Sequence, residues 1–473
     1  MKQVTIAALA GAVLLSAGAA HAEGDNINPE KLTAGATLTV PPYPGTFPKS
    51  LPPASISGTM PFAVPLPDII NTPLEIRPNF DYFSWESFIA LSWPAAPGQR
   101  GVPDQPDNPS AFLNAKVGTP VVWGTYKDSF ELFGQKTPSK WDSYAMDYNP
   151  CENSEAGAKT LIFSTMSDTP LMQTNQAFSF PLIDQRANYV YYDVRYNKAQ
   201  YEFIRVDELY LLKNLQSKEN APYGLQMPMT TGKVLGSIMV KAAWRIKADN
   251  DDISRYYSVP ARIYNPQTNA CSPPRTVLLV GLHIAHKVDP FTEWVWSTFE
   301  QVDNVPADSD VVPKPQAPPD GYSFNNGTGV PETIGGYDYR PPLTPSASPK
   351  PVQVTRLNPI PSTPPGQSTR DFNTYYQNLL KGTVWQFYEL IATQWPFNPG
   401  IGPDNPFQLM QNGGVYPQNA GTAFPVNGVV NTTMETYFQS NNDAAGAGGN
   451  SCMSCHYRAG QSDFSWGLNR RAH

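Results

Sequence analysis

Apolar positions along the chain predict a strand-rich centre. Residues 189–196 alternate between the two faces expected of a strand, with a period of two. Residues 236–247 and 255–264 have the composition of two neighbouring strands joined by a polar turn. Residues 277–286 form a nearly continuous apolar run, and large side chains alternate at 294–302. This last pair predicts a hairpin whose first strand is buried on both faces.

Apolar residues three or four positions apart predict helices around this sheet. The clearest patterns cover residues 80–91, with Asn79 as a candidate cap, and residues 372–391. Asn197 can cap a further helical stretch that reaches about residue 215. The sequence therefore predicts an α+β fold with a β-rich body, peripheral helices and a C-terminal segment of helices and loops.

Changes in composition divide the chain into candidate segments. A Pro-rich arm is expected at 23–77 and the β-rich body at 78–305. Residues 306–370 are again rich in proline, serine and glycine, which is typical of a linker or a long surface excursion. The C-terminal segment then covers residues 371–473.

Residues 1–22 have the pattern of a secretory signal peptide. Lys2 supplies the positive charge, residues 4–19 the apolar core, and Ala20-His21-Ala22 the small-residue cleavage site. No later segment approaches the roughly twenty uninterrupted apolar residues that a bilayer span needs. The sequence therefore predicts a periplasmic or otherwise exported protein with no membrane span in its mature chain.

The most specific motif lies near the end of the chain, at Cys452-Met453-Ser454-Cys455-His456. Two thiols separated by two residues can add to the two vinyl groups on one edge of a porphyrin, and the histidine that follows can bind the iron. The motif predicts one covalent haem c held by Cys452, Cys455 and His456. Because this attachment takes place outside the bacterial cytoplasm, the motif and the signal peptide support each other.

Two other uses of a C-x-x-C sequence fit its surroundings less well. A redox-active dithiol begins a helix that follows a strand, whereas residues 441–450 form a glycine-rich linker. A zinc site needs a further pair of ligands, and the other cysteines, Cys151 and Cys271, are solitary. We expect these two to form a disulfide in an oxidising compartment, with two inert thiols as the alternative.

No methionine follows His456, so candidates for a second axial ligand come mainly from upstream, with His473 as a weaker candidate downstream. Met434 is the first candidate, since a thioether ligand raises the reduction potential, and core packing is its alternative role. His283 is the next candidate, and His286 on the same predicted strand must point to the opposite face. Each of these histidines can instead be a hydrogen-bonded core residue, and a five-coordinate iron is also open. Arg458 is a candidate partner for a haem propionate.

Charge and composition narrow the choice of partners. The sequence has 33 Lys and Arg against 40 Asp and Glu, a formal net charge of −7. This balance argues against nucleic acid or an anionic membrane surface as a partner. With 50 prolines and 12% aromatic residues, the composition is typical of a loop-rich and strand-rich exported protein that can build a core.

The haem motif resembles that of c-type cytochromes, and the chain is similar to a group of large exported monohaem proteins of proteobacteria. The similarity includes residues 85–91, 281–284, 296–300, 431–435 and 451–456. It implies haem c and an exported location.

Three functions are consistent with these features. The first is a periplasmic monohaem c-type cytochrome that exchanges electrons with a redox protein or with a small-molecule donor or acceptor. The alternative is a haem-dependent oxidoreductase, peroxidase-like or oxygenase-like, in which His283 or His286 serves as an acid or base beside an open iron. A third is a binding module in which the haem has only a regulatory role.

Overall fold

The computed structural model describes most of residues 42–473 and two short strands near the N-terminus, β1 (Val4–Ala7) and β2 (Ala36–Leu38). The longest stretches outside the description are 8–35, 152–160, 165–172, 307–320, 397–422 and 441–449. Most of the expected signal peptide and the glycine-rich linker before the C-x-x-C-H motif thus lie outside the described residues. Within the described part of the chain, no helix has the length and apolar character to cross a membrane.

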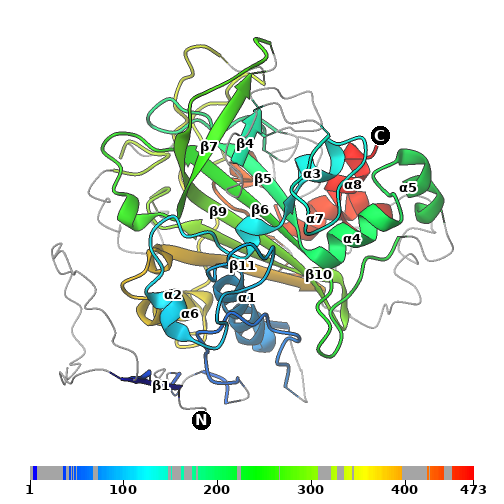
Figure 1. Cartoon of the computed structure of the whole chain (residues 1–473). Coiled ribbons are helices and arrows are strands. Elements are labelled where there is room, and N and C mark those ends of the chain that lie inside the picture. Colours follow the sequence, from blue (N-terminus) through cyan, green and yellow to red (C-terminus); the bar gives the residue numbers. More distant parts are fainter. Residues whose placement is uncertain are drawn as a thin grey trace.

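A large, mainly antiparallel sheet forms the centre of the molecule, in agreement with the predicted α+β class and β-rich body (Figure 1). Its main path runs in the order β12-β11-β10-β9-β6-β5-β3, and three further strands extend it beside β9. These strands are β3 (Lys127–Asp128), β4 (Leu161–Ser164), β5 (Tyr191–Tyr196), β6 (Ile238–Ile246), β7 (Ser258–Asn265), β8 (Ala270–Cys271), β9 (Arg275–Val288), β10 (Phe291–Gln301), β11 (Tyr388–Pro396) and β12 (Ala423–Phe424).

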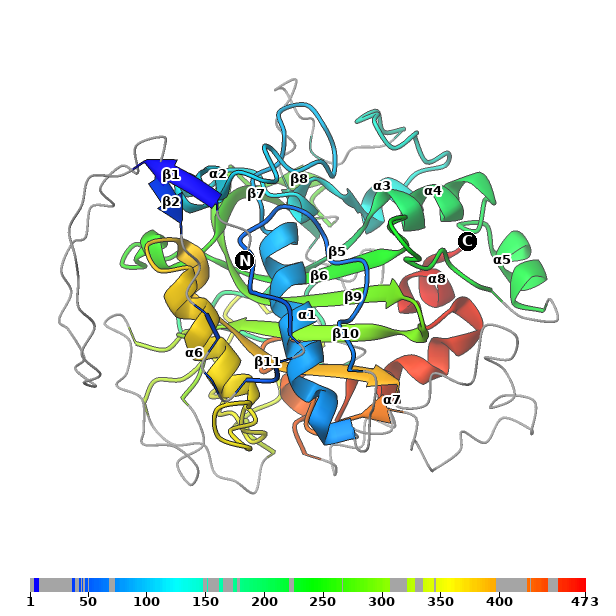
Figure 2. The ribbon, with the colours of Figure 1, turned by 90° about the horizontal axis from the view of Figure 1, so that it is seen from below.

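Different helices pack on the two faces of this sheet. On one face, α1 (Arg77–Leu91) and α6 (Thr369–Leu379) cross the strands (Figure 2). The Ser84 hydroxyl of α1 lies 2.7 Å from that of Ser297, and the Phe88 ring stacks on Phe299. The remaining helices are α2 (Pro109–Leu113), α3 (Ser129–Phe133), α4 (Lys198–Val206), α5 (Leu212–Glu219), α7 (Cys452–His456) and α8 (Trp466–Arg471).

The central hairpin confirms one prediction from the sequence and corrects another. Strands β9 and β10 pair antiparallel, as expected. Strands β6 and β7, however, are not neighbours, because both pair with β9. At 14 residues, β9 is long enough to pair with β6 along one edge and with β7 at the start of the other.

The predicted helix over 372–391 is only half right. Helix α6 ends at Leu379, and Gly382 follows with a φ of +90°, a conformation that glycine adopts most readily. Residues 388–396 instead form β11, which pairs with β10 and so adds the C-terminal segment to the sheet. Asn79 is not the cap of α1, whose N-cap is Ile76; the Asn79 side chain donates a hydrogen bond to the Pro65 carbonyl.

Two further connections fasten outlying parts of the chain to the body. In the described part of the N-terminal arm, Phe47 stacks on Phe372 with ring centroids 4.4 Å apart. Cys151 and Cys271 form a disulfide with their Cα atoms 5.8 Å apart, which confirms the favoured pairing. Residues from the expected linker at 306–370 are also buried, among them Phe324 and Val354.

Candidate functional site

The C-x-x-C-H motif forms the short helix α7, whose start is fixed by a capping box. The Ser451 side chain accepts a hydrogen bond from the Ser454 backbone, and the Ser454 side chain bonds back to the Ser451 backbone. Cys452 and Cys455 are three residues apart on this helix and therefore lie on the same side of it. Both are partly exposed free thiols.

The orientation of His456 is fixed by the turn that follows α7. Its Nδ1 atom lies 2.7 Å from the carbonyl oxygen of Phe464. A carbonyl can only accept, so Nδ1 carries the proton and Nε2 keeps its lone pair. Burial lowers the pKa of His456 to about 4, so the ring is neutral at pH 7. A neutral imidazole held through its other nitrogen is the arrangement that metal-binding histidines use.

The carbonyl that orients His456 is itself held by the sheet. Asp463 and Phe464 have φ values of +50° and +62°, and this left-handed pair turns the chain back toward α7. Asp463 is anchored by Lys287 of β9, whose Nζ lies 2.5 Å from its carboxylate, and by the Met227 backbone N–H at 2.7 Å. The position of the histidine thus depends on strand β9.

One row of side chains on the sheet lies beneath the motif. Cross-strand pairing aligns one residue from each of five strands, and directly opposed residues share a face: Tyr196, Met239, Ala285, Trp296 and Gln394. The ring of Trp296 lies 4.3 Å from that of His456, and the Gln394 side chain accepts a hydrogen bond of 2.7 Å from the Met453 N–H. At the other end of the row, Tyr196 contacts α8 at Gly467. The C-terminal segment therefore contacts both ends of this row.

The next row along the strands contains charged side chains. Lys241 pairs with His283, and His283 pairs with Thr298. The Nε2 atom of His283 lies 3.3 Å from Oε2 of Glu435, with 17% of the His283 side chain and 20% of the Glu435 side chain exposed. We call Lys241, His283 and Glu435 the open cluster. Leu282 and Ile284, the neighbours of His283 on β9, point to the opposite face of the sheet and are buried. Solvent therefore reaches the open cluster from the face on which the motif lies.

The charges of the open cluster are incompletely paired. Among the described residues, Nζ of Lys241 has no hydrogen bond or ion pair, and it lies 5.2 Å above the Tyr192 ring. Burial lowers the pKa of Lys241, although the nearby Glu435 opposes this effect. Burial also acts to raise the pKa of Glu435, but His283 and Lys241 more than offset it and hold that pKa below its usual value.

The two thiols have the protonation expected of unreactive cysteines. Burial raises the pKa of Cys452 well above its usual value, and burial also raises the pKa of Cys455. Cysteines of redox-active dithiols have lowered pKa values, because the thiolate is the nucleophile. Within the described residues, no group of three or more His, Cys, Asp and Glu side chains is placed to hold a metal ion.

The structure brings some of the sequence-predicted residues together and separates others. His283 faces the motif, whereas His286 faces α1, where it stacks on Phe83 and its Nε2 lies 2.7 Å from the Thr230 hydroxyl. Burial lowers the pKa of His286 to about 3, so it is a neutral core residue. Met434 is completely buried against Gly281, and Arg458 is exposed at the end of α7.

Several residues of the site carried no sign of their role in the sequence, although Trp296 and Glu435 lie in segments that carry the resemblance. Phe464 acts through a backbone carbonyl, which no motif can reveal. Trp296, Lys241 and Met239 are identified only by the pairing of β6, β9 and β10. Glu435 follows Met434 directly, but only the fold brings it to His283.

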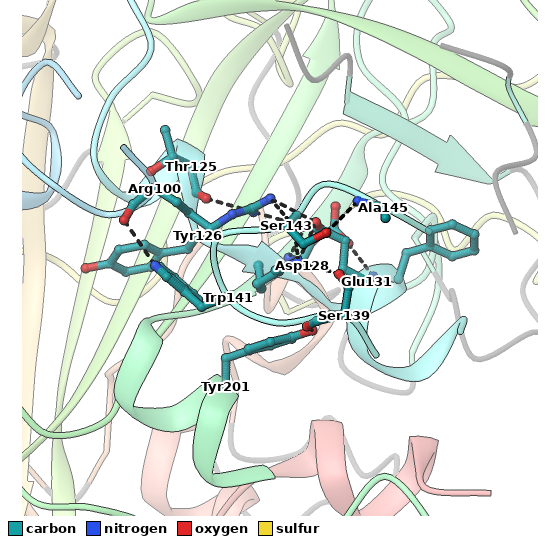
Figure 3. Close-up of polar contacts among 12 residues, drawn as sticks. Arg100, Thr125, Tyr126, Asp128, Glu131, Ser139, Trp141, Ser143, Ala145 and Tyr201 are labelled. Carbon is teal, nitrogen blue, oxygen red and sulfur yellow. Dashed lines mark hydrogen bonds and ion pairs between the residues drawn. The ribbon is translucent and has the colours of Figure 1, made fainter. Parts of the chain in front are cut away.

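A second charged cluster, distant from the motif in sequence, provides a contrast (Figure 3). Glu131 lies 3.1 Å from the Arg100 guanidinium and 3.3 Å from Nζ of Lys127, and these side chains are at most 2% exposed. Lys127 also donates to the Ser143 carbonyl at 2.6 Å, and Arg100 to the Thr125 carbonyl at 3.0 Å. We call Arg100, Lys127 and Glu131 the closed cluster, because each of its charges contacts an opposite charge away from solvent.

Comparison with known proteins does not assign the chain to a family. No family model, curated protein or solved structure that we searched matches the chain. The function must therefore be argued from the site itself.

Proposed function

We propose that the protein is an exported monohaem c-type cytochrome that carries one covalent haem and transfers electrons. The observation that carries the proposal is the bond between Nδ1 of His456 and the Phe464 carbonyl, on the same short helix that presents two thiols on one side. This combination leaves Nε2 of His456 available for iron, with both thiols on the same short helix.

Each residue of the motif has a defined task. Cys452 and Cys455 would hold the haem through two thioethers, each formed when the S–H adds across a vinyl double bond of the group. His456 would supply a nitrogen ligand to the iron, and the Phe464 carbonyl would strengthen it as a donor. The bound group supplies a one-electron couple at its iron. Trp296 and Gln394 hold α7 against the sheet so that these atoms keep their positions.

The raised thiol pKa values favour this proposal over a redox-active dithiol. A thiol whose pKa is raised stays protonated and is a poor nucleophile for disulfide exchange, whereas a thioether needs no free thiolate in the folded protein. The partly exposed residues of the open cluster also leave solvent-accessible space beside the motif. A periplasmic location follows from the proposed signal peptide.

The open cluster favours a second candidate function. Nε2 of His283 and Oε2 of Glu435 lie 3.3 Å apart close to His456, and an imidazole beside a carboxylate can move a proton at a ligand of the iron. If the iron has an exchangeable position there, the protein would be a haem-dependent oxidoreductase acting on peroxide, oxygen or another small molecule.

Spectroscopy of the exported protein tests both functions. We expect a pyridine haemochrome spectrum typical of two thioethers that survives acid–acetone extraction, and its loss in the double variant Cys452→Ala/Cys455→Ala. Haem that is extracted from the native protein would refute covalent attachment. Carbon monoxide then separates the candidates, because a ferrous iron with two protein ligands ignores it and an open iron binds it.

A further inference from the structure

We propose that Met239 supplies the second axial ligand of the haem iron, opposite His456. This inference rests on the proposed function, and it names a different residue from the sequence candidates Met434 and His283. It makes the site a histidine–methionine centre assembled from α7 and the middle of the sheet.

The register of three strands places Met239 on the correct face. Met239 pairs directly with Ala285, which pairs directly with Trp296. His456 lies on the Trp296 ring, so Met239 and His456 stand on either side of Ala285. Neighbouring strands are about 4.8 Å apart, so Met239 and Trp296 are separated by roughly 10 Å. The methyl side chain of Ala285 is the only one between them in this row.

Exposure distinguishes Met239 from its strand neighbours. Ile238 and Val240 are completely buried, whereas Met239 is partly exposed on the face that the C-terminal segment covers. The long, unbranched methionine side chain can reach into this space, and its thioether sulfur is a good ligand for haem iron.

Met434 is less well placed for the same role. It is 0% exposed, and its Cε atom packs against Gly281, away from the partly exposed part of the sheet. Gly281 lies four residues before Ala285 on β9, which corresponds to about 13 Å along a strand. The neighbouring His283 shares the open space, and its Nε2 atom lies 3.3 Å from Oε2 of Glu435 without a hydrogen bond among the described residues, so His283 is the competitor that the experiment must exclude.

Matched leucine variants of the haem-loaded protein test the proposal. Met239→Leu and Met434→Leu conserve side-chain volume, so both are expected to fold. In the wild type we expect the weak far-red band of sulfur-ligated ferric haem, and one strongly upfield-shifted methionine methyl signal in the ferrous protein labelled at its methionine methyl groups. Met239→Leu should lose both signals and bind carbon monoxide, whereas Met434→Leu should keep both signals.

Other outcomes overturn the proposal in distinguishable ways. Loss of the signals in Met434→Leu alone would assign the ligand to Met434. A wild-type spectrum without the sulfur band, altered by His283→Ala or Lys241→Ala, would assign a nitrogen ligand. Absence of covalent haem from the wild type would remove the proposed function itself, whereas intact covalent haem with an unchanged Met239→Leu spectrum would remove only this inference.

Discussion

The closed and open clusters contain similar charges in different surroundings. In the closed cluster, Glu131 lies between two cations, and the three side chains are almost fully buried. In the open cluster, Glu435 contacts His283, while Lys241 has no hydrogen bond within the described residues and keeps partial exposure. Buried charges that are fully paired with each other are typical of groups that support the fold. Incompletely paired charges beside solvent-accessible space are typical of sites that bind another group. We therefore assign the closed cluster a role in stabilising the fold and the open cluster a role in the candidate site.

The largest expected effect is the loss of Glu131. Glu131→Ala leaves Arg100 and Lys127 buried together without their counter-ion, which should lower the free energy of unfolding by about 3–5 kcal/mol. Urea denaturation followed by tryptophan fluorescence measures this change. Glu435→Ala is the matched variant in the open cluster, and we expect it to cost less because water can reach its partners. An equal or greater cost for Glu435→Ala would end the distinction between the clusters.

Glu86 is a third kind of buried charge, a carboxyl group without a cationic partner. Among the described residues, Glu86 on α1 has no ion pair, and its carboxylate accepts hydrogen bonds from Ser55 and from Tyr376. Burial raises the pKa of Glu86 to about 7, although these hydrogen bonds lower it. The folded state therefore holds this proton more tightly than the unfolded state, so the contribution is complete below about pH 4.5 and is lost as the pH rises through 7.

Glu86→Gln removes this pH dependence. The variant should match the wild type near pH 5 and gain about 2–3 kcal/mol of relative stability by pH 8. The readout is the difference in unfolding free energy between the two proteins at each pH, which cancels all other titrating groups. A difference that stays constant from pH 5 to pH 8 would show that Glu86 does not titrate in this range.

The packing of the C-terminal segment on β9 gives an effect of intermediate size. A Cβ atom at residue 281 would lie 3.1 Å from Cε of Met434 and 3.2 Å from Oδ1 of Asn431. Gly281→Ala should therefore cost about 1–3 kcal/mol, because residues 431–434 must move away from the strand. Gly232→Ala is not a suitable control, since its φ of +61° adds strain. Gly45, with open space around its Cβ position, serves better, and an equal loss in Gly45→Ala would contradict the packing explanation.

The smallest effect is expected at Lys241. Lys241→Met removes a desolvated cation that, among the described residues, is compensated mainly by the Tyr192 ring and by the field of Glu435. In the haem-free protein, the free energy of unfolding should change by less than about 1 kcal/mol, in either direction. Calorimetry of the haem-free variant provides the measurement. A loss as large as that of Glu131→Ala would place Lys241 among the structural ion pairs.

The sequence predicted those parts of the fold that depend on local pattern. The continuous apolar run of β9 and the spacing in α1 were sufficient, because a buried strand and a core helix have distinct periods. The pattern over 372–391 gave a wrong prediction for its second half, which forms a strand. Aromatic and apolar residues at three- and four-residue steps can also belong to a buried strand, and Gly382 follows the end of the helix. The neighbours of β6 could not be predicted, since the pairing of strands far apart in sequence is decided by tertiary packing.

The sequence pointed to the motif of the candidate site but not to most of its surroundings. Cys452, Cys455 and His456 are adjacent in sequence, and their chemistry fixes their spacing. The residues that surround them come from β6, β9, β10 and the 431–435 segment, which only the register brings together. His283 was found because a histidine in an apolar strand is conspicuous, whereas Met239 and Trp296 resemble ordinary core residues.

The intact mass of the exported protein, measured after denaturation, tests the central claim most directly. The protein should be produced with its full chain in a bacterium that attaches haem c, beside the variant Cys452→Ala/Cys455→Ala. We expect the wild type to retain the added mass of one haem through denaturation and the variant to carry none. A wild-type mass without haem, or equal masses of adduct in both proteins, would contradict it.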